Sequence, residues 1–172
     1  MMQKAVNNAR VLYRLGILRE DVEEAHKIFK KTPILLQTLE NPVVPEKKKE
    51  VLIEQIAQKS GMPKLLENFM KEMCRIGQIG QIMDIFHCYY EYWDEKNQIL
   101  RAQVIFAGAE EEGQEKEIQE QLERLYPGKT ILITSQTDPS LLGGYVIRVK
   151  YKEYDHSYEG RLRRLEGKLT GR

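Results

Sequence analysis

The sequence predicts a mainly helical protein with a small α+β part: a six-helix bundle over residues 1–98, followed by a small strand–helix–strand–strand–helix domain over residues 99–172. Two observations lead to this fold class. Up to about residue 98, apolar residues recur at three- and four-residue steps, which is the period of an amphipathic helix. From Ile99 the pattern changes to short apolar runs, which indicate strands alternating with helices.

The first three helices are predicted from apolar stripes and one helix-start signal. Residues 6–18 and residues 21–30 each place apolar side chains on one helical face. The residues expected to point inward are Val11, Leu12, Leu15 and Leu18 in the first helix and Val22, Ala25, Ile28 and Phe29 in the second. Thr32 followed by Pro33 is a good N-cap and first-turn pair for a third helix that ends at Leu39.

Prolines and glycines separate the next three helices. The fourth helix follows a turn at 40–45 and stops at Gly61, the fifth opens at Pro63, and the sixth follows the turn GQIGQ at 77–81. The residues expected to point inward are Val51, Leu52 and Ile56 in the fourth helix, Leu65, Leu66, Phe69, Met70, Met73 and Ile76 in the fifth, and Ile82, Ile85, Phe86, Tyr89 and Trp93 in the sixth.

The second domain combines three predicted strands with one acidic and one basic helix. The strands are expected at 99–108, 129–136 and 143–154, and the helices at 110–128 and 157–169. Between Glu110 and Glu123 there are seven acids and one lysine, whereas from Gly143 to Arg172 there are eight Lys or Arg and four acids. These faces complement each other or a partner, or they are simply solvated.

Composition narrows the class of protein. The 27 basic and 26 acidic side chains nearly cancel, which argues against a nucleic-acid-binding protein and against binding to an anionic membrane surface. No apolar run reaches the roughly 18 residues of a membrane-spanning helix, and the first residues do not resemble a signal peptide. Cys74 and Cys88 lack metal-ligand spacing, so buried free thiols in a reducing cytoplasm are expected.

No motif for catalysis or nucleotide binding is present, so neither enzymatic activity nor a cofactor or metal is predicted. The paired glycines in LLGGY lack the GxGxxG spacing and a following helix. His26, His87 and His156 lie on three separate elements. The tetrapeptide GQIG at 77–80 is similar to the loop with which KH domains hold a nucleic-acid backbone, but helices are predicted on both sides of it, whereas a KH fold needs strands.

Five segments resemble the delta subunit family of bacterial F-type ATP synthases, which includes the mitochondrial oligomycin-sensitivity-conferring protein. The two most specific are DPSLLGGYVIRV at 138–149 and DHSYEGRLRRL at 155–165. The others are ARVLYRLG at 9–16, LENPVVPEKKKEVL at 39–52 and NFMKEMCRIGQIGQI at 68–82. The resemblance implies a non-catalytic stator subunit, a single copy in a hetero-oligomer at the cytoplasmic face of the bacterial cell membrane.

The resemblance also implies two docking regions. In the family, a groove between the first and fifth helices receives the N-terminal helix of an α chain of the catalytic head; the candidate groove residues are Val11, Leu12, Leu15, Phe69, Met70, Met73 and Ile76, and plain bundle core is the alternative for each. The second domain lies near the b chains of the peripheral stalk; the candidate stalk-docking and signature residues are Asp138, Leu141, Leu142, Gly143, Gly144, Gly160 and Leu162.

Within the DPSLLGG segment, the two glycines are expected to allow close backbone approach, and Leu141 and Leu142 to enter the adjoining core or a contact. Lys150 and Tyr151 replace the Gly-Asp pair that is usual after this strand, so a tight hairpin is not expected there. Two other classes remain open: a KH-like RNA-binding adaptor and a helical protein–protein adaptor unrelated to the synthase.

Overall fold

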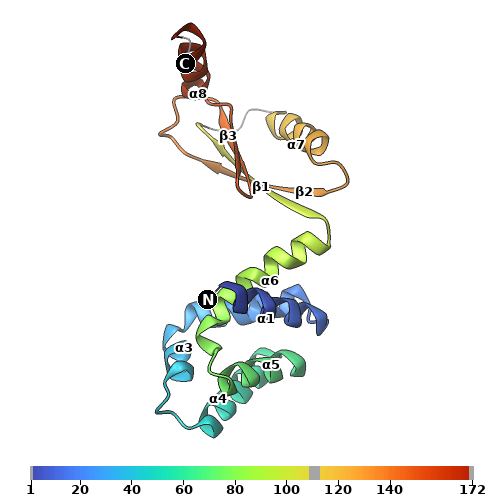
Figure 1. The fold of residues 1–172 in the computed structure, drawn as a ribbon, viewed down its shortest axis with the longest axis vertical. Helices are drawn as coiled ribbons and strands as arrows, with labels where there is room; N and C mark the ends of the chain where they lie inside the picture. The colour runs from blue at the N-terminus through green and yellow to red at the C-terminus, as the bar shows by residue number, and fades with distance from the viewer. Residues whose placement is uncertain (1, 109–112, 171–172) are drawn as a thin grey trace. The chain divides into compact units, whose positions relative to one another are not determined.

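The N-terminal half of the chain forms a bundle of six α-helices and one short 3-10 helix in the computed structural model, which describes residues 2–108 and 113–170 (Figure 1). These elements are α1 (Met2–Arg14), α2 (Arg19–Lys31), α3 (Pro33–Glu40), α4 (Glu46–Ser60), α5 (Lys64–Arg75), η1 (Ile79–Gln81) and α6 (Ile82–Lys96). The chain divides into two units, the first ending at Asp94 and the second beginning at Glu95. The predicted fold class, a helical bundle followed by a small α+β part, is confirmed.

The first helix starts earlier and ends earlier than the apolar pattern predicted. Its buried side chains are Ala5, Ala9 and Leu12, spaced by one helical turn or nearly so. The helix ends at Arg14, and Gly16 turns the chain with a left-handed φ of +70°. Leu15 and Leu18 therefore leave the predicted stripe and are exposed, so the inward orientation expected for them was wrong.

The fourth helix also turns a different face inward. Ile53 and Ala57 are buried on one line with Lys49, while Leu52 and Ile56 are half-buried. Val51 is exposed, and the prediction for it was wrong because the line that faces the bundle runs through positions 49, 53 and 57. Gly61 ends the helix as predicted, with a left-handed φ of +69°.

The second unit is a four-stranded sheet with one helix on its face. Its elements are β1 (Ile99–Phe106), α7 (Gln114–Leu125), β2 (Thr130–Thr137), β3 (Tyr145–Val149), β4 (Lys152–Asp155) and α8 (Tyr158–Thr170). The strand order is β2-β1-β3-β4, with β1 parallel to β2 and the other neighbours antiparallel. The buried cluster of this unit is Leu100, Ala102, Val104, Phe106, Ile118, Leu122, Ile147 and Val149, between the sheet and α7.

The predicted third strand is a β-hairpin, which corrects the expectation for Lys150 and Tyr151. Val149 pairs with Lys152, so the two residues between them form a tight loop. Lys150 adopts a positive φ of 51°, a conformation that disfavours side chains other than glycine by about 1–2 kcal/mol. Strand pairing and the ion pair between Arg148 Nε and Glu153 Oε2, at 2.7 Å, hold the loop despite that strain.

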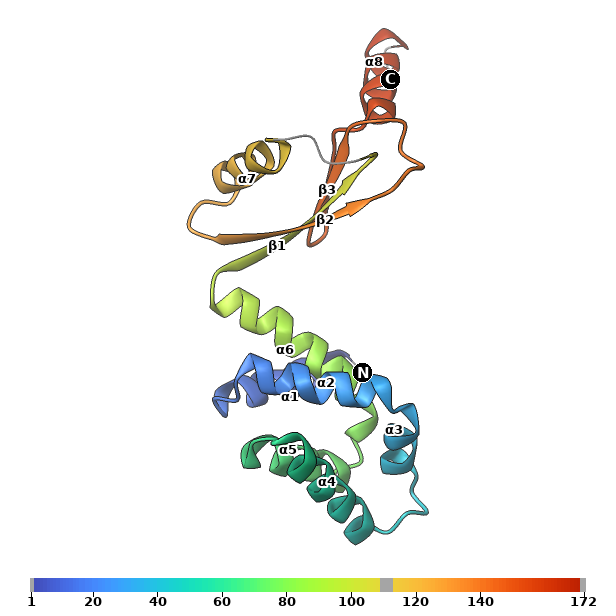
Figure 2. The same cartoon turned by 180° about the vertical axis from the view of Figure 1, so that it is seen from behind.

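The last helix leaves the end of the sheet instead of covering a face of it (Figures 1 and 2). From Arg161 to Leu169 all its side chains are exposed, except for the half-buried Gly167. Within the described part of this unit, no element covers the exposed leucines of α8: Leu162, Leu165 and Leu169.

Candidate functional site

The candidate groove residues of the bundle separate into two groups. Leu12, Phe69, Met70 and Met73 are buried in the bundle core. Val11, Leu15 and Ile76 are exposed, and they lie where α1 ends and where α5 ends. Leu65, at the start of α5, is also exposed and falls on the same helical face as Ile76, because 11 residues make three turns.

A polar contact and an ionic network fix this surface of the bundle. Asn8 Nδ2 of α1 donates a hydrogen bond to Gln78 Oε1, just beyond α5, at 2.9 Å. On α5, the buried Glu67 carboxylate pairs with Lys64 at 2.7 Å and with Lys71 at 2.8 Å. Lys71 also reaches Glu54 of α4, so α5 is held to α4 and its exposed face keeps one orientation. Hydrogen bonds from Lys64 and Lys71 lower the pKa of Glu67.

In the second unit, the two signature segments meet in space. The amide of Tyr158 donates to the Gly143 carbonyl at 3.0 Å, and the amide of His156 donates to the Tyr145 carbonyl at 2.9 Å. A β-carbon at position 143 would collide with the Tyr158 ring. One at position 144, where φ is +80°, would lie 2.5 Å from the His156 carbonyl oxygen. The close approach predicted for the glycine pair is therefore an approach to the start of α8.

Asp155 and Ser157 build the beginning of α8. Ser157 donates to Asp155 Oδ1 from its amide at 2.9 Å and from its hydroxyl at 2.6 Å. The Ser157 hydroxyl oxygen in turn accepts the amide of Gly160 at 3.0 Å, as an N-cap residue does. The hydrogen bonds from Ser157 lower the pKa of Asp155.

Asp138 stabilises the turn of the other signature segment through its own hydrogen bonds. Its amide donates to the Phe106 carbonyl at 2.8 Å, and its carboxylate accepts the Ser140 amide at 2.9 Å, so the turn is anchored to the end of β1. Hydrogen bonds from Ser140 lower the pKa of Asp138. Leu141 is half-buried, whereas Leu142 is 78% exposed and does not enter the core, so for Leu142 the other expected role, a contact with another chain, stays a prediction.

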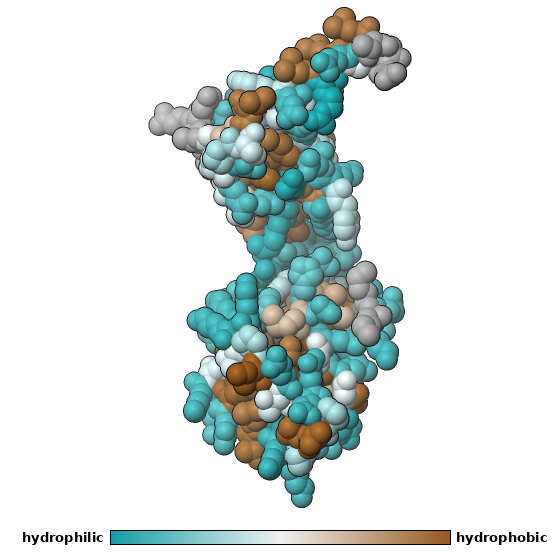
Figure 3. Space-filling view, turned by 90° about the vertical axis from the view of Figure 1, so that its left-hand side faces the viewer, coloured by the Kyte–Doolittle hydropathy of each residue, from teal (hydrophilic) through white to brown (hydrophobic). Residues whose placement is uncertain are grey.

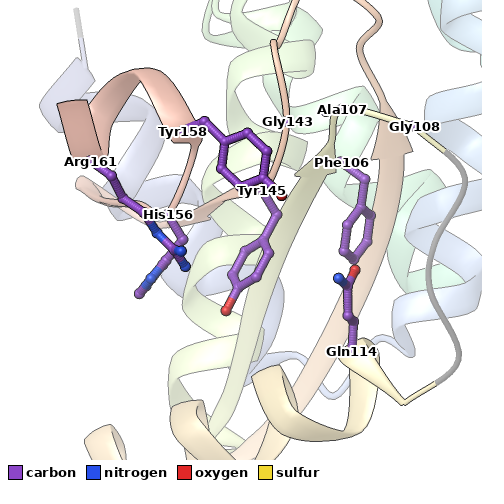
Figure 4. Close-up of a pocket in the computed structure, with 10 residues that line it drawn as sticks. Phe106, Ala107, Gly108, Gln114, Gly143, Tyr145, His156, Tyr158 and Arg161 are labelled. Atoms are coloured by element: carbon purple, nitrogen blue, oxygen red, sulfur yellow. The ribbon is translucent and has the colours of Figure 1, made fainter. Parts of the chain in front are cut away.

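A pocket of about 310 Å³ lies at this junction between the sheet and α8. Figure 4 shows Phe106 and Gln114 on one side, His156 and Arg161 on the other, and the rings of Tyr145 and Tyr158 between them. Burial lowers the pKa of His156, and the positive charges of Arg161 and Arg164 act in the same direction.

The exposed face of α8 carries a stripe that the sequence analysis missed, apart from Leu162. Tyr158, Leu162, Leu165 and Leu169 follow one another at four-, three- and four-residue steps, and each is more than half exposed. Figure 3 shows hydrophobic side chains at the surface of this helix, at the top of the view. Basic side chains flank the stripe: Arg161, Arg163, Arg164 and Lys168. The helical spacing itself was the available signal.

Other candidate chemistry is not supported by the described residues. Among residues 2–108 and 113–170, no three His, Cys, Asp or Glu side chains are grouped as metal ligands. No helix in that same part of the chain has the length and apolar character needed to cross a membrane. The GQIG turn at 77–80 follows α5 and includes the first two residues of η1. It has α-helices on both sides and no strand in the described part of this unit, so the arrangement of a KH domain is not present.

Both units expose apolar side chains on helices, a feature of proteins that bind other chains. Comparison with known proteins shows which family of that class this is. The profile of the ATP synthase delta (OSCP) subunit family matches residues 7–169. The chain belongs to the ATP synthase delta (OSCP) subunit family.

Individual relatives agree with this assignment. The chain is 30% identical to the ATP synthase subunit delta of Nostoc punctiforme, over 91% of this chain and 78% of that protein. It is 27% identical to the subunit delta of Hyphomonas neptunium, over 98% and 97% of the two chains. Its fold matches a chain in a cryo-EM structure of the Toxoplasma gondii mitochondrial ATP synthase hexamer with a TM-score of 0.66, at 14% identity over 96% of this chain and 97% of that one.

Proposed function

We propose that this chain is the stator subunit that joins the catalytic head of a bacterial F-type ATP synthase to its peripheral stalk, so that the head resists the torque of the rotor during ion-driven synthesis. It acts as a single copy at the cytoplasmic face of the cell membrane, held there through the other subunits. The observation that carries the proposal is that each of the two units exposes its own apolar helical surface.

On the bundle, the surface of α1 and α5 is proposed to receive the N-terminal helix of an α chain of the head. An amphipathic helix binds through apolar anchors on one helical face; Val11 and Leu15 are about one turn apart, and Leu65 and Ile76 are three turns apart on one face of α5. The buried residues beneath them, Leu12, Phe69, Met70 and Met73, hold these two helices in the core instead of touching the ligand directly. The contribution of each exposed anchor is about 1–2 kcal/mol.

On the second unit, the α8 stripe is proposed to bind the carboxyl ends of the b chains. Four basic and two acidic side chains lie between its apolar residues, so an amphipathic helix with mostly acidic flanks is the complementary partner. In this proposal Gly143, Gly144 and Gly160 act indirectly, because they fix where α8 leaves the sheet. Asp138 also acts indirectly, because it anchors the turn before the two glycines to the end of β1. Two weak sites joined in one chain reach high overall affinity through effective concentration.

The first docking site is tested by calorimetric titration of the full chain with a peptide from the N-terminus of the cognate α chain. Leu15→Asp and Ile76→Asp are the informative variants, because both side chains are exposed, so that a charge at either position stays in contact with water. Met70 and Met73 are only 1% and 4% exposed, so a charge at either position would unfold the bundle and prove nothing about binding. Ile34→Asp, on the exposed side of α3, is the matched control.

The proposal is supported if the chain binds the peptide saturably at a one-to-one ratio, if both informative variants lose this binding, and if the control variant keeps it. Unchanged binding in both variants would show that the peptide binds another face of the bundle. The stalk site is tested separately by co-purification with a soluble b-chain segment. Leu162→Asp with Leu165→Asp is expected to abolish capture, and Leu125→Asp, on α7, to leave it intact.

A further inference from the structure

One pocket of the second unit combines an apolar floor with three lysines. It has a volume of about 190 Å³ and is lined by Leu100, Tyr126, Lys129, Val149, Lys150, Tyr151 and Lys152. Leu100 and Val149 are each 1% exposed, so the floor is part of the core of this unit. The pocket lies at the end of β3 that is opposite to the start of α8, which contacts Gly143. It shares no residue with the two docking surfaces proposed above.

The pocket forms where the end of α7 meets the β3–β4 hairpin. Val149 pairs with Lys152 in the hairpin, so both side chains lie on one face of the sheet, the face that α7 covers. Tyr126 follows the last residue of α7, and its hydroxyl shares a hydrogen bond of 2.9 Å with the hydroxyl of Tyr154 in β4. This bond fixes the end of α7 beside the hairpin. Lys129 follows in the loop that leads to β2.

The positive charge of this pocket is not balanced by the carboxylate nearest to it along the chain. That carboxylate, Glu153, is already paired with Arg148 at 2.7 Å. In the part of the second unit that the structure describes, Lys129, Lys150 and Lys152 form no ion pair. Three uncompensated ammonium groups beside an apolar surface create a local positive potential, which attracts carboxylates.

The hairpin loop adds a strained residue and an exposed aromatic ring to the pocket. Lys150 has a φ of 51°, a left-handed conformation that glycine adopts without strain. Tyr151 is 98% exposed. These two residues stand where the family usually has a Gly-Asp pair, which would remove the strain and the aromatic ring and add a negative charge. Backbone strain and exposed tyrosines both occur preferentially at binding sites.

We propose that this pocket binds an acidic peptide segment of a partner chain, with one aromatic side chain of the peptide in the pocket. A cavity of about 150 Å³ accepts a benzene ring, so a pocket of about 190 Å³ has room for one aromatic side chain. Acidic residues on both sides of that anchor complement the three lysines, and the ring of Tyr151 offers a second aromatic contact. This contact is additional to the proposed stator role.

The experiment is a titration of the ¹⁵N-labelled full chain with the pentapeptide DDFDD, followed by NMR. Saturable shifts are expected at the amides of Leu100, Lys150, Tyr151 and Lys152, with a dissociation constant on the order of 0.1–1 mM for one anchor and a few exposed ion pairs. The amide of Gly143, at the other end of β3, is expected to stay unchanged. Raising the salt concentration from about 50 to about 300 mM should weaken binding several-fold.

Three further ligands separate the contributions of the anchor, the charge and the peptide. DDADD lacks the aromatic anchor and NNFNN lacks the charges, and each is expected to bind at least about tenfold more weakly than DDFDD. Phenylacetate carries a ring and one carboxylate without a peptide, and it is also expected to bind more weakly. Equal binding of DDADD or NNFNN would overturn the proposed recognition, and equal binding of phenylacetate would assign the pocket to a small aromatic acid instead.

A variant of the chain tests whether the hairpin loop forms the site. Lys150→Gly combined with Tyr151→Asp restores the pair that is usual in the family and relieves the strain, so the hairpin stays folded. Binding of DDFDD should fall by about tenfold or more. Lys116→Asp, at an exposed position in the first turn of α7, also lowers the net charge by two and should bind as the parent does. Equal binding by the double variant and the parent would overturn the proposal, whatever the binding of the α-chain peptide or the b-chain segment.

Discussion

The carboxylate of Asp155 lies where a β-carbon at Gly160 would be, at the first turn of α8. The same carboxylate accepts both hydrogen bonds from Ser157, and Ser157 caps the helix through the Gly160 amide. The absence of a side chain at position 160 is therefore what lets an aspartate approach the helix start closely enough to hold its N-cap residue. One glycine and one aspartate thus determine the direction in which α8 leaves the sheet.

Gly160→Ala is expected to destabilise the second unit by about 1–3 kcal/mol, because the new methyl group displaces a carboxylate that is hydrogen bonded to the cap. Without that clash, alanine would favour a helix by about 1 kcal/mol over glycine. Gly167→Ala in the same helix is the control and is expected to be neutral or stabilising. Urea unfolding followed by circular dichroism measures both, and a Gly160→Ala variant as stable as the control would contradict the structural role given to Asp155.

Lys150→Gly is expected to stabilise the hairpin by about 1 kcal/mol, because the position has a φ of +51° and glycine adopts it without strain. The greater freedom of glycine in the unfolded chain offsets part of this gain. Tyr151→Gly, in the same loop but not at positive φ, should instead destabilise. Thermal unfolding of the two variants decides the matter, and a lower midpoint for Lys150→Gly would show that the loop tolerates lysine at no cost.

Much of the fold was predictable because helical period and strand alternation are local properties. All six bundle helices were expected, and so was the close approach at Gly143 and Gly144. The contact of Gly143 with Tyr158 was not predicted, because these two positions come together only when the chain folds. The hairpin was missed because strand pairing overrides the local preference of Lys150.

The candidate groove residues show that helical periodicity alone does not predict which side chains of a stripe are buried. A stripe such as Leu65, Phe69, Met73 and Ile76 spans a wide arc of a helix, and the sequence does not say which neighbours cover it. The structure buries the two middle residues and exposes the two outer ones, since the buried face of α5 runs through Leu66, Met70 and Cys74 and leaves Leu65 and Ile76 at its margin. The α8 stripe could have been predicted, because its spacing is regular and four of the intervening residues are basic.

Acid is expected to lower the free energy of unfolding of the bundle, because Glu67 becomes protonated. Hydrogen bonds from Lys64 and Lys71 lower its pKa below the ordinary 4.5, so the folded state binds this proton less readily than the unfolded state. The stabilisation is present in full above pH 4.5 and is lost as the pH falls through the lower pKa of the folded state. Glu67→Gln should remove this part of the acid sensitivity and, at neutral pH, lower stability by about 1–3 kcal/mol.

Unfolding by urea at neutral pH and at a pH below the ordinary glutamate pKa measures this difference. The exposed pair of Arg75 and Glu72 on the same helix is the control, since Glu72→Gln removes an ion pair that solvent already screens. If Glu67→Gln and the parent chain lost stability equally on acidification, the ionic network around Lys71 would not be the acid-sensitive element.

Arg19 holds the end of α6, and the single tryptophan of the chain should report its loss. Its guanidinium donates from Nη1 to Asp94 at 2.6 Å and from Nε to Glu23 at 2.8 Å. It also lies over the rings of Tyr90 and Trp93, about 5 Å from each centroid. Lysine keeps the charge but not the planar fork or the stacking, so Arg19→Lys should cost about 1–2 kcal/mol.

The measurement is the fluorescence of Trp93, together with the unfolding midpoint of the bundle. Arg19→Lys is expected to shift Trp93 emission to longer wavelength, because the ring loses a covering guanidinium and meets more water. Glu23→Gln removes only the more exposed ion pair and should leave the emission unchanged. An unshifted spectrum in Arg19→Lys with a lowered midpoint would assign the stability of this end of α6 to the hydrogen bond with Asp94 alone. An unshifted emission spectrum together with an unchanged unfolding midpoint would show that Arg19 does not stabilise the end of α6.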